Sequence, residues 1–446
     1  FPLPPETAPP RIYFRAVRMA RFFGNLEALG KPKPKQSLDI TLDPAQKKSG
    51  GLLVYVHVPF CRRKCPYCSF HSQTFNQVTF HWYMQALGRE IELWGERLNR
   101  PEVQTVYIGG GTPNLLAPGE VERIMSRLRK SFRLESGLEA SMEANPEAHA
   151  SPEYFRALMG LGINRISLGV QSLDDGQLKF LGRGHSARQA REAFANARAA
   201  GLANLGLDLM WGLPGQRSRN WLETLKSVVK TMKPEHLSCY NLTVEPGTPL
   251  ENTLQTGRAE LPGDSEQARM FVHGAEFLES EAYLQYEISN FARMGYSCRH
   301  NMGYWEGRSY LGLGPSAVST IGDRRFTNPS FMDAYDAAVR GGFAGLEFEK
   351  LDDAVRLKEY VMLSLRTSTG LSLAEYRKRS GRDLVSSRQQ LMDALYKNGL
   401  IRLSHGRLRL TKNGMLVSNA ITARLMESES PSPLPEAGVP ELEPDA

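Results

Sequence analysis

The chain has 446 residues, of which 41% are hydrophobic, and a formal net charge of +7. This length suits one large α/β domain with a smaller one, and no apolar run reaches the roughly 18 residues that would span a bilayer. Residues 1–50 hold nine Lys and Arg against four Asp and Glu, so this leader alone carries +5. The rest of the chain has almost no basic excess, which argues against a broad nucleic-acid groove.

The leader is rich in proline and contains a Lys-Pro-Lys-Pro-Lys run at 31–35, a composition typical of a flexible arm. Its basic, acid-poor stretch at 11–23 is also compatible with the end of an organelle-targeting segment, although a cytoplasmic location is the favoured prediction. The chain has five cysteines, three of them within eight residues. An odd, clustered set indicates a metal site in a reducing compartment rather than a disulfide framework.

From residue 51 onward, short apolar segments alternate with amphipathic ones, a pattern that predicts parallel βαβ units. The expected strands are Leu52–Val58, Gln104–Gly109, Leu138–Glu143, Asn164–Val170, Asn204–Met210 and His236–Leu242. The expected helices are Thr79–Leu98, Pro118–Phe132, one that begins at Pro152, Ala187–Ala200, Asn220–Met232 and Ser265–Glu281. Periodicity alone leaves open whether these units form a doubly wound sheet or an incomplete barrel.

The C-terminal third changes character. Residues 286–350 are rich in glycine and aromatic side chains and are expected to complete the barrel domain of residues 51–285. From 351 to 426 the pattern predicts a winged-helix-like α+β domain, followed by a disordered tail at 427–446. Its expected elements are helices Ala354–Leu365, Leu373–Ser380 and Ser386–Asn398 and a hairpin of Leu400–Leu403 with Arg407–Thr411. Such a domain could bind DNA, but without a concentrated basic face a packing role is favoured.

The most specific signal is the segment Cys61-Arg-Arg-Lys-Cys65-Pro-Tyr-Cys68, which directly follows the first expected strand. Thiolates are the usual ligands of iron–sulfur clusters, and three of them would leave one iron of a [4Fe–4S] cubane open to a small chelating molecule. The alternative is zinc, with His57 or His71 as a fourth ligand. Structural zinc sites, however, usually draw on two separated cysteine pairs.

This loop, with the aromatic Tyr67 before its last cysteine, resembles the motif of the radical S-adenosylmethionine (SAM) superfamily. The resemblance implies a partial (β/α)6 TIM-type barrel with the cluster at the C-terminal ends of the strands. It also implies an exchangeable SAM on the open iron, reductive cleavage of SAM to methionine and a 5′-deoxyadenosyl radical, and an electron donor as a partner.

The resemblance further implies SAM contacts after successive strands. The glycine-rich run 109–113 lets the backbone approach a ligand, and Glu143 matches the family carboxylate that binds the ribose hydroxyls. From the residues alone, each of these positions could equally be a polar residue at a barrel rim. The SAM-binding residues implied by the resemblance are Tyr55, Tyr67, Gly110, Gly111, Thr112, Glu143, Gln171, Arg183 and Asp208.

Over about residues 52–425 the chain resembles the oxygen-independent coproporphyrinogen III dehydrogenase (HemN) family and its HemW haem-chaperone branch. The dehydrogenases have a further cysteine two residues after the third, where this chain has Phe70. The run from His300 to Trp305 reads as the HNxxYW motif of the HemW branch, which implies that His300 binds haem. Imidazole is a suitable axial ligand. From composition alone, His300 would be a hydrogen-bonded structural histidine.

Three functions follow from these patterns. The favoured one is a HemW-type protein that binds haem and passes it to an acceptor protein. The alternative is an enzyme that oxidatively decarboxylates two propionates of coproporphyrinogen III, and a third is a radical SAM protein that modifies nucleic acid. A homodimer is compatible with any of them, and no catalytic residue is assigned. One departure from the HemW pattern is that the run 312–318 lacks a second histidine.

Overall fold

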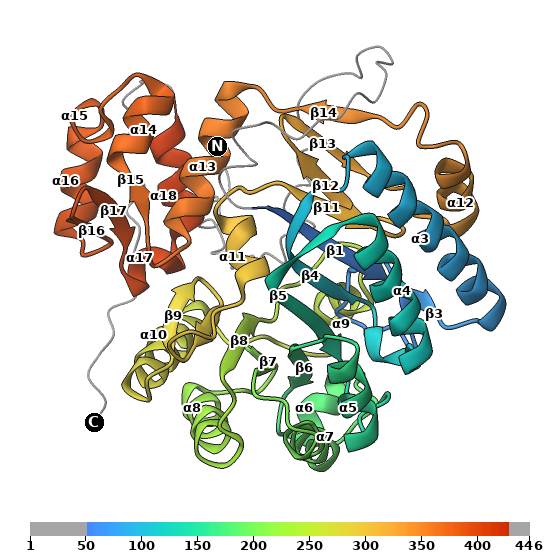
Figure 1. Cartoon of the computed structure of the whole chain (residues 1–446). Coiled ribbons are helices and arrows are strands. Elements are labelled where there is room, and N and C mark those ends of the chain that lie inside the picture. Colours follow the sequence, from blue (N-terminus) through green and yellow to red (C-terminus); the bar gives the residue numbers. More distant parts are fainter. Residues whose placement is uncertain (1–50, 428–446) are drawn as a thin grey trace, which may run out of the picture.

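A twelve-stranded sheet forms the centre of the molecule in the computed structural model, which describes residues 51–427 (Figure 1). Its six middle strands are parallel to one another and follow each other in chain order. They are β1 (Leu52–Val58), β4 (Glu102–Gly110), β5 (Arg133–Ala144), β6 (Arg165–Gln171), β7 (Leu205–Trp211) and β8 (His236–Asn241).

Helices cover the outer face of this curved sheet (Figure 1). The principal ones are α3 (Gln77–Arg97), α4 (Pro118–Ser131), α5 (Pro152–Gly160), α7 (Ala187–Ala199), α8 (Ser218–Ser227) and α10 (Asp264–Ser280). Shorter helical segments are η1 (Pro113–Leu115), α6 (Asp175–Phe180), η2 (Val228–Met232) and α9 (Pro249–Gln255). Every residue of β6 and β7 is buried, as expected for parallel strands that are covered on both faces.

Additional strands extend the sheet at both edges. On one side β11 (Tyr310–Leu313) runs parallel to β1, and β12 (Val318–Ile321), β13 (Arg324–Thr327) and β14 (Phe348–Lys350) follow in antiparallel order. On the other side β10 (Asn290–Ala292) and β9 (Leu284–Glu287) are added antiparallel to β8. Within the described residues the sheet therefore ends at β14 and β9 instead of closing. This confirms the predicted partial barrel.

The edge strands were not predicted, because each has only three or four residues, too few to show a clear periodicity. The same part of the chain forms α11 (Arg299–Trp305) and α12 (Met332–Arg340). Two two-residue strands, β2 (Phe60–Cys61) and β3 (Gln73–Thr74), pair with each other and bracket the cysteine loop.

The C-terminal module has helices and a three-stranded sheet, as the predicted winged-helix-like architecture requires. Its helices are α13 (Asp353–Leu365), α14 (Leu373–Ser380), α15 (Leu384–Ser387), α16 (Gln389–Lys397), α17 (Lys412–Leu416) and α18 (Ser418–Met426). Its strands are β15 (Leu371–Ser372), β16 (Ile401–Ser404) and β17 (Arg407–Leu410). The single helix predicted at 386–398 is divided at Arg388, whose φ of −131° and ψ of 30° are not helical. Helices α17 and α18 were not predicted.

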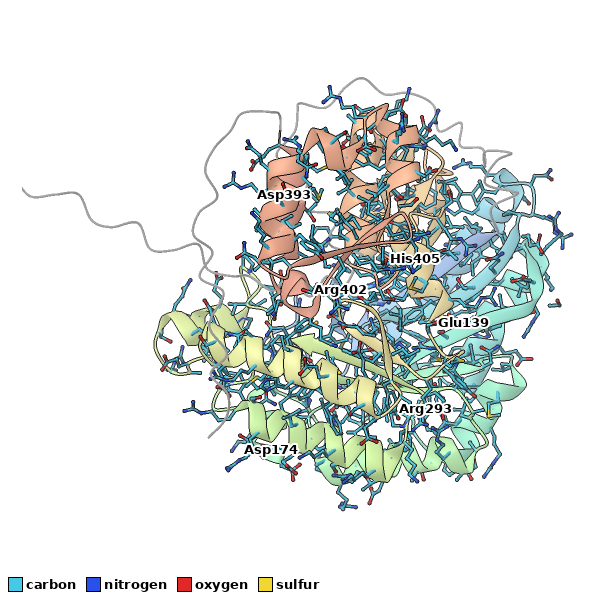
Figure 2. The ribbon with its side chains drawn as sticks, turned by 90° about the vertical axis from the view of Figure 1, so that its left-hand side faces the viewer. Glu139, Asp174, Arg293, Asp393, Arg402 and His405 are labelled. Carbon is cyan, nitrogen blue, oxygen red and sulfur yellow. The ribbon has the colours of Figure 1, made fainter. Side chains whose placement is uncertain are left out.

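This module packs against the barrel, beside α10 (Figure 2). Lys412 of α17 forms an ion pair with Glu279 of α10, with 2.5 Å between the two atoms. Trp305 of α11 and Leu363 of α13 form a small hydrophobic cluster. Helix α11 is thus held between the barrel strands and the C-terminal module.

Residues 1–50 and 428–446, with the predicted leader, its targeting alternative and nearly all of the predicted tail, lie outside the described residues. In the part of the chain that the structure describes, no helix combines the length and the apolar character needed to cross a membrane.

Candidate functional site

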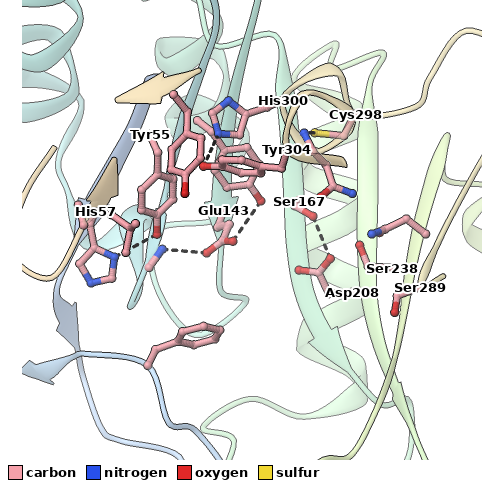
Figure 3. A pocket seen from close by; sticks show the side chains of 18 of the residues that line it. Tyr55, His57, Glu143, Ser167, Asp208, Ser238, Ser289, Cys298, His300 and Tyr304 are labelled. Carbon is pink, nitrogen blue, oxygen red and sulfur yellow. Dashed lines mark hydrogen bonds between the residues drawn. The ribbon is translucent and has the colours of Figure 1, made fainter. Parts of the chain in front are cut away.

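The barrel encloses a cavity of about 600 Å³, a volume within the usual range for small-molecule sites (Figure 3). Its walls are inward-facing residues of the parallel strands. At one end lie Phe70 and His71 of the cysteine loop, and at the other lie His300 and Tyr304 of α11. A smaller hollow of about 70 Å³ lies beside the cysteines and shares Gly110, among other residues, with the large cavity.

The structure brings nearly all the predicted site residues together. The small hollow is lined by Cys61, Cys65, Tyr67, Cys68, Gly110, Gly111, Thr112, Glu143, Gln171, Arg183 and Asp208. The other two predicted residues, Tyr55 and His300, line the large cavity. These side chains come from loops and strands far apart in sequence, and they meet because parallel strands place their C-terminal ends at one edge of the barrel.

Alternation along β6 explains how one strand serves both regions. Because successive side chains of a strand point to opposite faces, Ile166, Leu168 and Val170 face the helices. The intervening positions face inward: Arg165 and Ser167 line the large cavity, and Gln171 lines the small hollow. At about 3.3 Å per residue, Gln171 lies roughly 20 Å along the strand from Arg165. The barrel interior therefore has a cysteine end and a distant floor.

The cysteine loop is held close to the glycine-rich loop after β4. The N–H of Thr112 donates to the Phe60 carbonyl at 2.7 Å, and the N–H of Phe75 donates to the Cys61 carbonyl at 2.9 Å. A Cβ atom on Gly111 would lie only 2.5 Å from the Phe60 carbonyl oxygen and 3.0 Å from Cys61 Sγ. Only glycine allows this approach.

The three thiols fit an iron–sulfur cluster. Cys61, Cys65 and Cys68 are partly exposed, and none of the three forms a disulfide. Burial raises the pKa of the Cys61 thiol, whereas its hydrogen bond with Thr112 lowers that pKa. The Nη1 of Arg183 lies 3.8 Å from Cys65 Sγ, so a positive charge faces the place where thiolates would carry negative charge.

The zinc alternative is not favoured. Within residues 51–427 no three His, Cys, Asp or Glu side chains are placed to hold a metal ion between them, whereas a cubane binds each thiolate to a separate iron. His57, the suggested fourth zinc ligand, has both ring nitrogens engaged. Its Nε2 donates to the His71 carbonyl at 2.9 Å, so Nδ1 accepts from the Tyr55 hydroxyl at 3.0 Å. Burial lowers the pKa of His57 to about 4.

The two predicted carboxylates are held in fixed orientations (Figure 3). Glu143 accepts from the Tyr107 hydroxyl and from the Gly110 N–H, each at 3.1 Å. Asp208 accepts from the Ser167 hydroxyl at 2.9 Å. Both residues line the small hollow, so their carboxylates face the space beside the cysteine loop.

Gln171 and Arg183 both lie beside Gly169 near the end of β6, because a Cβ atom on that glycine would lie 3.0 Å from Gln171 Nε2 and 3.5 Å from Arg183 Nη2. Gln171 is buried in a left-handed conformation with φ of +66°, which is uncommon for a residue other than glycine. The Nη2 of Arg183 donates to the Gly169 carbonyl at 2.8 Å. Burial alone would lower the pKa of Arg183, but nearby Tyr67 and Cys65 hold it above its usual value. The guanidinium thus remains charged beside the cysteine loop.

His300 lies at the floor of the barrel, at the opposite end from the cysteines. It is 1% exposed, and its ring stacks on Tyr107 with 5.1 Å between centroids. Its Nδ1 lies 2.7 Å from the Thr105 hydroxyl and its Nε2 lies 3.0 Å from the Tyr304 hydroxyl. Burial lowers its pKa to about 3, so the imidazole is neutral. In this conformation His300 is a hydrogen-bonded histidine, and a metal would have to replace Tyr304 at Nε2.

The sequence analysis missed Glu139, which anchors α11. One carboxylate oxygen accepts from the Arg299 N–H at 2.9 Å, and the other accepts from the His300 N–H at 3.0 Å and from Cys298 Sγ at 3.4 Å. A negative charge at the start of a helix is stabilising because the first N–H groups have no partner within the helix. The sequence did contain a signal for Glu139. Because side chains alternate along a strand, Glu139 is expected on the same inward face as Glu143.

Replacing Glu139 with alanine is expected to destabilise the protein by about 2–4 kcal/mol, because three donors lose their acceptor and two of these hydrogen bonds are buried. Glu139→Gln retains one acceptor oxygen and should cost less. Urea denaturation of the purified full-length chain measures both. Equal stability of the wild type and Glu139→Ala would show that α11 does not depend on this carboxylate.

Comparisons with known proteins agree with this geometry. Residues 55–228 match the model of the radical SAM superfamily, and residues 351–417 match that of the HemN C-terminal domain. The "Heme chaperone HemW" of Bacillus subtilis is 33% identical over 368 residues, which cover 82% of this chain and 97% of that protein. The "Radical S-adenosyl methionine domain-containing protein 1, mitochondrial" of Bos taurus is 30% identical over 418 residues, covering 90% and 94%.

Among solved structures, the coproporphyrinogen III oxidase HemN of Escherichia coli superposes with a TM-score of 0.71 at 24% sequence identity, covering 84% of this chain and 90% of that one. This similarity supports the fold. The relatives that share a third of their residues over nearly their whole length identify the branch. The chain therefore belongs to the HemW family of the radical SAM superfamily.

Proposed function

We propose that this chain is a haem chaperone that binds haem in the barrel cavity and passes it to an acceptor protein. The observation that carries the proposal is the 600 Å³ cavity, with a neutral histidine at its floor and a cysteine loop at its other end. The similar proteins of several bacteria bear the name heme chaperone.

The cavity has the lining that a planar macrocycle needs. Aromatic rings provide large, rigid apolar surfaces, and their hydroxyl or N–H groups can still make hydrogen bonds. The aromatic residues of the lining are Tyr55, Phe70, Tyr107, Tyr240, Tyr286, Tyr304, Trp305 and Tyr310. Trp305 Nε1 and His236 Nδ1 are buried and have no hydrogen-bond partner in the described part of the chain, so polar groups for a ligand remain.

His300 would be the axial ligand of the haem iron. Since its imidazole is neutral, it need not lose a proton before it binds a metal. The Thr105 hydroxyl holds Nδ1, as second-shell groups generally orient a histidine ligand. On haem binding, the Nε2 atom would lose its hydrogen bond with the Tyr304 hydroxyl and bind the iron instead.

Cys61, Cys65 and Cys68 would hold a [4Fe–4S] cluster, which with SAM supplies one-electron reductive chemistry when bound. The glycine-rich backbone at 110–112 would approach SAM closely. The side chains proposed to contact SAM are Tyr55, Tyr67, Thr112, Glu143, Gln171, Arg183 and Asp208. An electron donor would then be a second partner, beside the haem acceptor. The cytoplasmic location and the homodimer remain predictions from the sequence.

Haem titration of the anaerobically reconstituted wild type and a His300→Ala variant tests the proposal. We expect a haem spectrum typical of histidine ligation in the wild type. In the variant we expect an affinity lower by at least the roughly 10- to 100-fold that is lost when groups around metal ligands are removed. A wild-type spectrum that equals free haem, or one that His300→Ala leaves unchanged, would contradict the proposal.

Tyr304→Phe is a companion variant for this experiment, in which the change is expected in the opposite direction. It removes the hydroxyl that occupies His300 Nε2 and keeps the ring. We expect haem to bind roughly fivefold more tightly, because one hydrogen bond worth about 1 kcal/mol no longer competes. Weaker binding would show that the Tyr304 hydroxyl contacts the haem instead of competing with it.

The dehydrogenase alternative is less well supported. The position of the extra cysteine of that group is occupied by Phe70, which lines both hollows. The same reconstituted sample, given coproporphyrinogen III, SAM and a reductant, would form protoporphyrinogen IX if the alternative held.

A further inference from the structure

Arg165 is a buried charge without an ion-pair partner. It is the first residue of β6, is 2% exposed and lines the floor of the large cavity. Its Nε has no hydrogen-bond partner, and in residues 51–427 no carboxylate lies within ion-pair distance of its guanidinium. Burial of an unpaired charge is costly, so buried guanidinium groups are nearly always compensated.

The nearest negative groups are already engaged. Glu139 and Cys298 contribute to the field around Arg165 and, against the effect of burial, raise its pKa. Both oxygens of Glu139, however, accept hydrogen bonds from the start of α11. Three carboxylates line the cavity: Glu143 accepts from Tyr107, Asp208 accepts from Ser167, and Glu287 accepts from the Ser289 N–H and the Asn290 side chain. None of these groups supplies the carboxylate that a guanidinium prefers as a two-pronged partner.

The surroundings of Arg165 offer further polar groups to a ligand. A Cβ atom on Gly206 would lie 3.2 Å from His236 Nδ1 and 3.5 Å from Arg165 Nη2, so both side chains lie over this glycine. His236 has one nitrogen 2.7 Å from the Tyr286 hydroxyl, and its Nδ1 has no partner. Ser238 and Ser289 lie together on the neighbouring wall of the same cavity (Figure 3).

We propose that Arg165 and His236 form a carboxylate-binding subsite at the barrel floor, which takes a propionate group of the haem. This inference rests on the proposed function and adds the group that orients the ligand. Haem carries two carboxylates at one edge of an apolar ring, and His300 lines the same cavity as Arg165. A ligand held by iron at one point and by a propionate at another has a single orientation. Lys64, the other cation of the lining, belongs to the cysteine loop at the opposite end.

A comparison of haem with haem dimethyl ester tests the subsite, because the ester has no propionate charge and the same ring and iron. The full-length chain is titrated with both ligands as wild type, Arg165→Gln and Arg165→Lys. We expect the wild type to prefer haem by about 10- to 100-fold. Arg165→Gln should bind the two ligands with nearly equal affinity, and Arg165→Lys should retain part of the preference. Arg198→Gln, which removes an ion pair with Glu235 outside the cavity, should keep the full preference.

The outcomes separate the two proposals. A wild type that binds neither ligand contradicts the haem-chaperone function itself. A wild type that binds both equally, or an Arg165→Gln variant that keeps the full preference for haem, contradicts the subsite and leaves the function intact. Loss of folding in Arg165→Gln would not imitate the predicted result, because the ester affinity would fall as well. In that event the decisive measurement is the preference of Arg165→Lys, which keeps the charge, for haem over haem dimethyl ester.

Discussion

Serine in place of Cys61, Cys65 or Cys68 is expected to reduce the iron and sulfide content of the reconstituted protein about tenfold or more. Thiolate sulfur is the ligand that iron–sulfur clusters require, and all three thiols lie on the short segment that runs from the end of β2 to β3. The characteristic EPR signal of the reduced cluster should disappear together with the iron.

Cys239→Ala provides the matched control for this experiment. Cys239 is buried in β8, and burial raises the pKa of its thiol well above the usual range, as for an inert core cysteine. Iron and sulfide content should stay at the wild-type level in this variant. Retention of iron after any of the three loop replacements, or zinc in the purified wild type, would overturn the assignment of the site.

Glu90→Ala is expected to destabilise the protein by about 3–5 kcal/mol. Glu90 lies on α3 and is fully buried. Its carboxylate oxygens accept from the Gly314 N–H and the Asn328 side chain, each at 2.7 Å, and from the Tyr335 hydroxyl at 2.6 Å. The side chain ties α3 to the segment that follows β11. Alanine would leave three buried donors without an acceptor and create a cavity.

The pH dependence of the Glu90 contribution has a definite sign. Burial raises its pKa from 4.5 to about 7, although the three hydrogen bonds oppose the rise. The folded state therefore binds the proton more tightly than the unfolded state. The stabilisation from this proton is complete below pH 4.5 and is lost as the pH rises through about 7.

The measurement is the difference in free energy of unfolding between the wild type and Glu90→Gln, which cannot titrate. The wild type should lose up to about 3 kcal/mol relative to the variant between pH 5 and pH 8. Taking the difference cancels the other buried groups, such as His57, whose lowered pKa gives the opposite trend. If the free energy of unfolding of the wild type, relative to that of Glu90→Gln, stays constant or increases as the pH rises, Glu90 is ionised throughout this range.

Patterns in the sequence were sufficient for the overall fold and the cysteine loop. The six parallel strands have long apolar runs, and the C-x3-C-x2-C spacing lies in one loop, so both are local features. The edge strands from β9 to β14 were missed, because three or four residues carry too little periodicity to be recognised. The break at Arg388 was also missed, since no proline or glycine marks it.

Patterns among neighbouring residues of the sequence therefore determined the fold class, the partial barrel and the ligands proposed for the cluster. Long-range packing determined the structure of the barrel floor. It placed His300 far from the cysteines and gave both of its ring nitrogens a hydrogen-bond partner. It also engaged Glu139 with α11 and left Arg165 facing a cavity without a partner. The alternation of Arg165, Ser167, Gly169 and Gln171 could have indicated one inward face. The sequence could not indicate which of those positions lack a partner, because the partners come from other elements. Ser167, for example, donates to Asp208, which lies 41 residues further along the chain, and only the folded chain brings the two within hydrogen-bond reach.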